Sequence, residues 1–324
     1  MTEPAIITKD LTKVFGRFTA VDALNLSVNR GELFGLLGPN GAGKTTTVRM
    51  LCTLIEPTRG TAIVAGHDLR EEAAEVRRQI GVVSEGISLY KDLTTVENLK
   101  LLSTLYDIPK RAAESRIQEL LDMFGFREKA NRLVSALSSG WAKKSMICAA
   151  LLHSPQVLFL DEVTSGLDPQ SAIGLQDFTR KLCNQGVTVV WTTHYMSEPE
   201  KICDRVGVIF AGRLVQVGTP SELKHSVDEL NTVEVETPGL SAAVINKIQK
   251  LSDVCKVTYD DPMLRVTCER HDELAEGVMK TLLDAGARVR AVNTREPTLE
   301  EAFISLTGGE EEIDRFLERA SQKK

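Results

Sequence analysis

The sequence lacks any apolar run approaching the roughly 20 residues that a membrane-spanning helix needs. It also lacks a signal-peptide pattern, because its first ten residues include Glu3 and Asp10 and no long apolar segment. These absences, together with an ordinary mixture of charged and apolar residues, predict a soluble globular protein that does not itself cross a membrane.

An excess of basic residues is absent too. Lys and Arg number 39 against 45 Asp and Glu, which gives a formal net charge of −6. This balance argues against nucleic acid or an anionic membrane surface as the main partner. The cysteines form no C-x-x-C pair and stand at positions 52, 148, 183, 203, 255 and 268. We expect free, mostly buried thiols in a reducing cytoplasm, rather than disulfides or a metal site.

The length of 324 residues exceeds what one hydrophobic core usually serves, so two domains are expected. Residues 1–227 alternate short apolar runs with helical patterns, which predicts an α/β domain with a parallel sheet and an antiparallel β flank. The period changes to 3.6 over about 90–155, which predicts a helical insert there. Its two expected apolar stripes are Val96, Leu99, Leu102 and Leu105, and Ile117, Leu120, Leu121 and Phe124.

A second domain is predicted over residues 228–308, where the pattern indicates strand, helix, two strands, helix and strand. This βαββαβ order is typical of a ferredoxin-like fold. Leu299 to Leu306 is expected to form a short final helix. Residues 309–324 are a highly charged tail, for which a solvated, partly frayed helix is favoured over a binding arm.

A glycine-rich loop stands between a predicted strand, Leu33 to Leu37, and a predicted helix. Backbone N–H groups of such a loop converge on one anion, and the helix N-terminus adds partial positive charge. Lys44 is expected to reach the β- and γ-phosphates, and the Thr45 hydroxyl to ligate Mg²⁺. The predicted phosphate loop and the residue after it are Gly38, Pro39, Asn40, Gly41, Ala42, Gly43, Lys44, Thr45 and Thr46.

Two acids follow a second apolar strand, in Leu158-Phe159-Leu160-Asp161-Glu162. Ligands bind at this end of the strands in open α/β sheets. We expect Asp161 to hold Mg²⁺ through water, and Glu162 to be the general base that polarises the attacking water. His194 follows the next strand, where an imidazole is placed to bind the γ-phosphate; a lone histidine there is usually structural, so this role depends on the other motifs.

In this order the motifs resemble the nucleotide-binding subunits of ATP-binding cassette (ABC) transporters. The resemblance covers residues 5–225 and includes Ser165-Gly166-Leu167-Asp168 directly after the acids. Leu137-Ser138-Ser139-Gly140-Trp141 stands where the family carries its LSGGQ signature. Residues 230–308 resemble the C-terminal domain of exporter-type members, and the segment from Thr53 to Asp68 resembles drug- and sodium-exporter members. The fold implied is a P-loop NTPase cassette.

The resemblance implies a head-to-tail dimer, a homodimer or a pair with a second ATPase subunit, that encloses two ATP molecules. Ser138, Ser139 and Gly140 would bind the nucleotide held by the other subunit, and Asp168 would report across the interface. Phe15 stands where the family places an aromatic that stacks on adenine; a core aromatic on an edge strand is the alternative.

Three positions depart from the family pattern. Glu85 stands where a glutamine is usual; a carboxylate there can still ligate Mg²⁺ but adds negative charge near the γ-phosphate. Ser139 replaces the first signature glycine, and Trp141 replaces the signature glutamine and is expected to pack at the dimer interface. These changes indicate either subfamily drift with normal activity or a weakened signature half of the site.

The resulting hypothesis is an Mg²⁺-dependent ATP hydrolase that powers an ABC exporter from the cytoplasmic face of the cell membrane, bound to a polytopic permease. Two alternatives are a soluble ABC-type ATPase that serves as a regulator or assembly factor, and a nucleotide-binding module without turnover. Glu162 argues against the last, because loss of the base is the simplest route to an inactive site.

Overall fold

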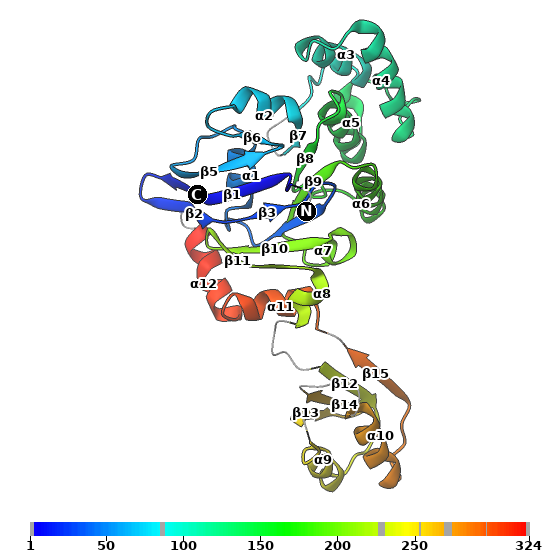
Figure 1. Cartoon of the computed structure of the whole chain (residues 1–324). Helices are drawn as coiled ribbons and strands as arrows, with labels where there is room; N and C mark the ends of the chain where they lie inside the picture. Colours follow the sequence, from blue (N-terminus) through cyan, green and yellow to red (C-terminus); the bar gives the residue numbers. More distant parts are fainter. Residues whose placement is uncertain are drawn as a thin grey trace. The chain divides into compact units, whose positions relative to one another are not determined.

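The structure is a computed structural model that describes residues 3–84, 88–225, 231–252, 254–268, 274–295 and 297–321 (Figure 1). The chain divides into two compact units. The first unit comprises residues 1–220 together with 311–324, and the second comprises residues 221–310. The chain therefore leaves the first unit and returns to it at its end.

The first unit is built on a six-stranded sheet in the order β11-β10-β4-β9-β8-β7. All neighbours from β10 to β7 run parallel, while β11 pairs antiparallel with β10. The continuous apolar runs predicted this sheet, since every residue of β4, β8 and β9 is buried. The strands are β4 (Leu33–Leu37), β7 (Ile80–Val83), β8 (Val157–Asp161), β9 (Thr188–Thr193), β10 (Arg205–Phe210) and β11 (Arg213–Gly218).

An antiparallel sheet forms the predicted β flank, with β1 at its centre paired to β2, β3 and β5. Residues 25 and 26 separate β2 from β3, and there the Asn25 side chain accepts from the backbone N–H of Asp10 and donates to its carboxylate. The strands are β1 (Ile6–Phe15), β2 (Phe18–Leu24), β3 (Ser27–Val28), β5 (Arg59–Val64) and β6 (His67–Asp68).

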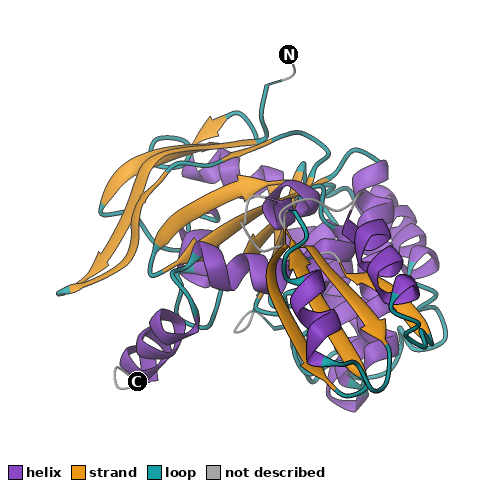
Figure 2. Ribbon diagram, turned by 90° about the horizontal axis from the view of Figure 1, so that it is seen from below, coloured by secondary structure: helices purple, strands orange, loops and turns teal. Residues whose placement is uncertain are grey.

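Helices flank these strands (Figure 2), and three of them form the insert that the change of period predicted. In α4 (Lys110–Met123) the expected apolar stripe is buried at Ile117, Leu120 and Leu121. In α3 (Thr95–Leu105) the expected stripe was wrong beyond Leu99: a face with polar residues is buried instead, and Leu105 is 69% exposed. The other helices of this unit before residue 220 are α1 (Lys44–Leu51), α2 (Ala73–Gln79), α5 (Ser139–Leu151), α6 (Pro169–Asn184) and α7 (Ser197–Ile202), with a 3₁₀ turn at Val134–Ala136.

The second unit has the predicted βαββαβ order, and its antiparallel sheet runs β13-β14-β12-β15, as in ferredoxin-like folds. Val233, Leu264 and Val266 of the sheet share a core with Val278 and Leu282 of α10. The elements after residue 219 and before the last helix are α8 (Pro220–His225), β12 (Asn231–Glu236), α9 (Ala242–Ile248), β13 (Val254–Asp260), β14 (Met263–Cys268), α10 (Leu274–Asp284), β15 (Ala291–Arg295) and α11 (Leu299–Leu306).

The charged tail forms a helix, α12 (Glu310–Ser321), as expected. The helix is not wholly solvated, because Phe316 of α12 lies against Phe210 of β10 with ring centroids 4.9 Å apart. The sequence shows Ile313 and Phe316 three residues apart in a charged segment, a spacing that places both on one side of a helix.

Four cysteines, at positions 52, 148, 183 and 203, are buried free thiols, as expected. Cys255 is exposed, so the expectation of burial does not extend to it. Among the residues that the structure describes, no helix is long and apolar enough to cross a bilayer.

Candidate functional site

The phosphate loop, residues 38–45, joins β4 to α1. Gly41 and Gly43 have φ values of 85° and 109°, which side chains rarely adopt. A Cβ at Gly38 would lie 2.2 Å from the backbone oxygen of Ile209, and one at Gly43 would lie 2.6 Å from that of Ala20. Close backbone packing thus requires both glycines. Gly43 is also the N-cap residue of α1, and because it has no side chain, it gives the first N–H groups of the helix no hydrogen-bond acceptor from a side chain.

The remaining loop residues present an open face. Asn40 and Gly41 are exposed, while Ala42 is buried and its carbonyl accepts from the N–H of Gly212 at 2.9 Å. Thr45 and Thr46, in the first turn of α1, are half-buried. The turn of the β10–β11 hairpin therefore supports the loop from behind.

Lys44 is 3% exposed, and its ammonium lies inside the loop. Nζ donates to the carbonyl oxygens of Gly38 at 2.8 Å and Pro39 at 3.1 Å, and lies 3.1 Å from Oε1 of Glu162. Burial lowers the pKa of Lys44, and the neighbouring Glu162 carboxylate opposes that shift. The loop thus holds a cation where a phosphate would need one.

Asp161 ends β8 and is 2% exposed. Its Oδ1 accepts from the hydroxyls of Thr45 at 3.2 Å and Thr192 at 2.5 Å. Burial raises the pKa of Asp161, while the hydrogen bonds from Thr192 and Thr45 oppose that rise. The two Mg²⁺ ligands predicted from separate motifs are therefore in contact.

Glu162 has a left-handed backbone, with φ of 50°, and its N–H donates to both the carbonyl and the hydroxyl oxygen of Thr192, at 3.2 and 3.1 Å. Such strain is typical of functional sites. Its Oε2 lies 3.5 Å from Nδ1 of His194, which is buried and makes no hydrogen bond in the described structure. The carboxylate thus stands between Lys44 and His194.

Thr192 was not among the predicted site residues, although it orients both acids. Its signal in the sequence is the pair Thr192-Thr193, where polar residues end an otherwise apolar strand.

Two further residues, Phe15 and Glu85, are predicted on the resemblance. Phe15 is 49% exposed at the end of β1, with the Lys13 ammonium 5.1 Å from its ring centroid, so it is not a core aromatic. Glu85 lies outside the described residues.

The signature segment, residues 137–141, leads into α5, and Ser138 is its N-cap residue. Ser138 and Ser139 are exposed, and the Ser138 side chain makes no capping hydrogen bond. A Cβ at Gly140 would lie 3.0 Å from Oγ of Ser171, which donates to the Asp168 carboxylate at 2.6 Å. Hydrogen bonds from Ser171 hold the pKa of Asp168 below its usual range. The first turn of α5 thus lies beside the first turn of α6.

Trp141 packs within its own chain. Its ring lies 5.1 Å from that of Phe126, and the ammonium groups of Lys129 and Lys144 lie 4.1 and 4.4 Å from its centroid. The sequence alone could not place these residues beside Trp141, because Phe126 and Lys129 come from the loop after α4. The expectation that Trp141 packs at a dimer interface is not tested by these contacts.

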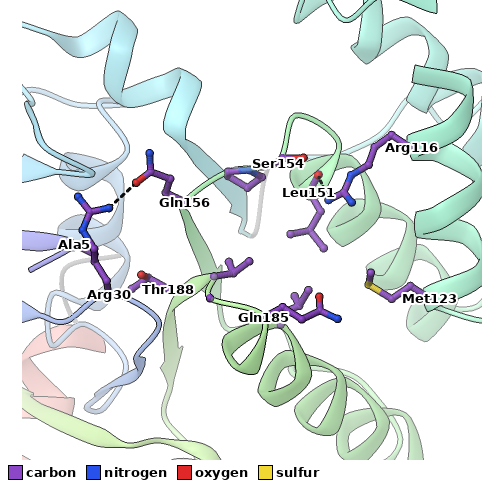
Figure 3. Close-up of a pocket in the computed structure, with 13 residues that line it drawn as sticks. Ala5, Arg30, Arg116, Met123, Leu151, Ser154, Gln156, Gln185 and Thr188 are labelled. Carbon is purple, nitrogen blue, oxygen red and sulfur yellow. Dashed lines mark hydrogen bonds between the residues drawn. The ribbon is translucent and has the colours of Figure 1, made fainter. Parts of the chain in front are cut away.

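A cavity of about 290 Å³ lies elsewhere, between the start of β8 and β9 and helix α4 (Figure 3). Gln156, Thr188 and Arg116 line it, and Arg30 donates to Gln156 across one wall at 2.9 Å. Gln156 precedes β8 and Thr188 begins β9, whereas the phosphate loop and both acids lie at the opposite, C-terminal ends of β4 and β8. None of the described site residues lines this cavity, so it is separate from the predicted nucleotide site.

Comparisons with known proteins agree with this geometry. A family profile described as "ABC transporter" matches residues 21–165, and one described as "ATP-binding protein DrrA1-3-like, C-terminal domain" matches residues 218–307. The daunorubicin resistance ATP-binding protein DrrA3 of Streptomyces coeruleorubidus is 38% identical over 97% of this chain and 99% of its own length. The linearmycin resistance ATP-binding protein LnrL of Bacillus subtilis is 33% identical over 93% and 97%.

Among solved structures, a dimeric bacterial ABC transporter cassette matches with a TM-score of 0.60 and 27% identity. The match covers 66% of this chain and 98% of that cassette.

Proposed function

The chain belongs to the family of ABC transporter ATP-binding proteins, and we propose that Lys44, Glu162 and His194 carry out its ATP hydrolysis. As a member it is an ATPase that powers an exporter-type transporter. The observation that carries the residue assignment is the position of the Glu162 carboxylate between the Lys44 ammonium, at 3.1 Å, and His194, at 3.5 Å.

Each residue has a distinct task in this proposal. Lys44 binds phosphate oxygens with a charge that the loop already holds in place. Glu162 takes the proton of the attacking water, and its backbone bonds to Thr192 keep the carboxylate oriented. His194 has a buried Nδ1 without a hydrogen-bond partner among the described residues, which leaves the imidazole available to the γ-phosphate or the water.

We also propose Mg²⁺ as the cofactor. The described residues hold no cluster of three metal-binding side chains, which suits an ion bound through one carboxylate, one hydroxyl and substrate phosphates. Asp161 and Thr45, in contact at 3.2 Å, would hold it, and Glu85 is a third candidate. The ion would neutralise charge on the phosphate oxygens.

For assembly, we propose a head-to-tail dimer in which Ser138, Ser139 and Gly140 bind the nucleotide of the partner, docked on a polytopic permease at the cytoplasmic face of the membrane. The exposure of Ser138 and Ser139 at the start of α5, and the dimeric state of a similar cassette, support this arrangement. The relatives' names, which refer to daunorubicin and linearmycin resistance, favour an antibiotic as cargo.

The decisive experiment on the site is Glu162→Gln. Hydrolysis by the purified chain should fall by about 10²–10³-fold while ATP binding persists, because a neutral amide cannot accept the proton. Glu114→Gln on the exposed face of α4 is the matched control and should leave the rate unchanged. Parental hydrolysis by Glu162→Gln would show that another group is the base.

A second experiment tests transport. Inside-out vesicles that contain the chain and its permease should take up daunorubicin in an ATP-dependent manner, and Glu162→Gln should abolish this uptake. ATPase activity without any cargo movement or permease binding would favour a soluble regulatory role.

A further inference from the structure

Glu198 is a buried acid that the proposed mechanism does not use. It lies in α7, four residues after His194, and is 8% exposed. Its Oε1 accepts from the side-chain amide of Gln176 at 3.4 Å, and its Oε2 accepts from the indole N–H of Trp191 at 3.3 Å. One side chain thus joins α7 to α6 and to β9.

Both donors are neutral, and no Lys, Arg or His in the described part of the chain forms an ion pair with Glu198. A buried carboxylate without a cation is costly, so electrostatic pairing does not explain its place here. What the carboxyl group supplies is a pair of acceptor atoms that face two different elements.

The three joined elements are those that carry the catalytic loops. β9 ends at Thr192 and Thr193, of which Thr192 binds both Asp161 and the Glu162 backbone. α6 begins at its N-cap residue, Asp168. α7 follows the turn that contains His194, and the Glu198 N–H donates to the Tyr195 carbonyl at 3.2 Å.

The turn itself has few other restraints in the described structure. The Tyr195 N–H donates to the Thr193 hydroxyl at 2.9 Å, and the rings of His194 and Tyr195 lie 4.2 Å apart. His194 makes no hydrogen bond through its buried Nδ1. The direction of its imidazole therefore depends on how both ends of the turn are held.

We propose that Glu198 is a positioning residue for hydrolysis: by binding Trp191 and Gln176 together, it fixes the turn that aims His194 at Glu162. This inference rests on the proposed roles of His194 and Glu162. It predicts that acceptor atoms, and not charge, are what position 198 requires.

Two substitutions of similar volume distinguish a requirement for acceptor atoms from a requirement for charge. Glu198→Met fills the site but accepts no hydrogen bond, so kcat for ATP should fall about tenfold, with KM changed less than about twofold. Glu198→Gln keeps an acceptor for Trp191, and the Gln176 amide can rotate to accept from the new amide N–H. This variant should keep kcat within about twofold of the parent.

A double-mutant cycle with His194→Ala shows whether Glu198 acts through the histidine. Glu198→Met should have no further effect on kcat in the His194→Ala background, because the group it orients is gone. An additional loss there, a parental kcat in Glu198→Met alone, or an equal loss in Glu198→Gln would each overturn the proposal.

The same experiments separate this inference from the proposed function. If His194→Ala keeps the parental rate, the role assigned to His194 fails, and a lowered kcat in Glu198→Met then has another cause. If His194→Ala is impaired but Glu198→Met is not, only the role of Glu198 fails. Thermal unfolding of Glu198→Met and Glu198→Gln at equal protein concentration checks that each variant is folded.

Discussion

The two halves of the proposed nucleotide site are built in opposite ways. In the phosphate-loop half, Lys44 and Asp161 are buried, and hydrogen bonds or ion pairs connect them to Thr45, Glu162 and Thr192. In the signature half, Ser138 and Ser139 are exposed and Ser138 makes no side-chain capping bond. The first half is organised within one chain; the second presents open groups to something outside it.

Support for the two halves differs as well. Polar contacts hold the two acids in place. The free-energy cost of placing the acids there shows in the strained backbone of Glu162 and the raised pKa of Asp161. The signature segment is instead supported behind Gly140, where Trp141 lies among Phe126, Lys129 and Lys144. Substitutions in the first half should therefore remove chemistry, and those in the second should change stability or assembly.

The largest effect is expected for Lys44→Ala. Loss of the ammonium leaves Asp161 and Glu162 without a cation and removes the charge that binds phosphate, so ATP hydrolysis should fall by about 10³-fold or more. Steady-state phosphate release measures this. Lys9→Ala, at an exposed position of β1, is the control, and a loss of similar size there would point to damage to the fold.

In the same half of the site, Asp161→Asn should increase stability while it removes activity. Burial raises the pKa of Asp161, so the folded chain binds this proton more tightly than the unfolded chain. The carboxylate therefore destabilises the fold at pH values above its folded pKa, and this cost disappears as pH falls below the unfolded pKa. The Asn variant should be more stable than the parent at pH 7.5, and this gain should be absent near pH 3, below the unfolded pKa of about 3.9.

Thermal unfolding of the nucleotide-free chain at both pH values tests this effect, and ATP hydrolysis should be lost in parallel. A variant that is less stable than the parent at pH 7.5 would contradict the account of a buried acid whose charge destabilises the fold.

A smaller effect is expected for Phe15→Ala. Phe15 and Phe18 are register partners at the end of the β1–β2 hairpin and are 49% and 43% exposed. If only Phe15 stacks on adenine, its loss should weaken ATP binding by about fivefold, which is the scale of one aromatic contact. Phe18→Ala is the matched control, and titration of a fluorescent ATP analogue gives both affinities. Equal losses in the two variants would remove the adenine assignment.

The smallest effect on turnover is expected for Trp141→Gln, which restores the residue usual in the family. Loss of the packing against Phe126 and of two cation–π contacts should destabilise the chain by about 1–3 kcal/mol. The ATPase rate at a temperature where the variant is folded should change less than about threefold. A large gain in rate would instead support the hypothesis of a weakened signature half.

The same contrast shows what the sequence could predict. The phosphate loop, Asp161 and Glu162 follow from local rules, because glycine spacing and apolar strands that end in acids need no knowledge of distant contacts. Thr192 and Glu198 escaped prediction because their importance comes from partners 31 and 22 residues away. The contacts of Trp141 and Phe316 likewise depend on aromatic residues elsewhere in the chain.

The ferredoxin-like unit was predictable from its order of elements alone, since alternate apolar residues of β12 and β14 form one face. Local rules were less reliable where a helix buries polar residues. In α3 the hydroxyl of Thr95 contacts that of Ser145 at 2.9 Å, so the buried face did not follow the leucine stripe.

The central claim, that the two halves come together from two chains, is tested most directly by complementation. Lys44→Ala disables the phosphate loop, and Gly140→Asp places a negative charge in the signature segment, with Gly174→Asp on α6 as its control. Each disabled protein alone should be inactive. An equimolar mixture should recover about a quarter of the parental ATPase rate, because mixed dimers contain one intact site. A mixture as inactive as its components would contradict a shared site.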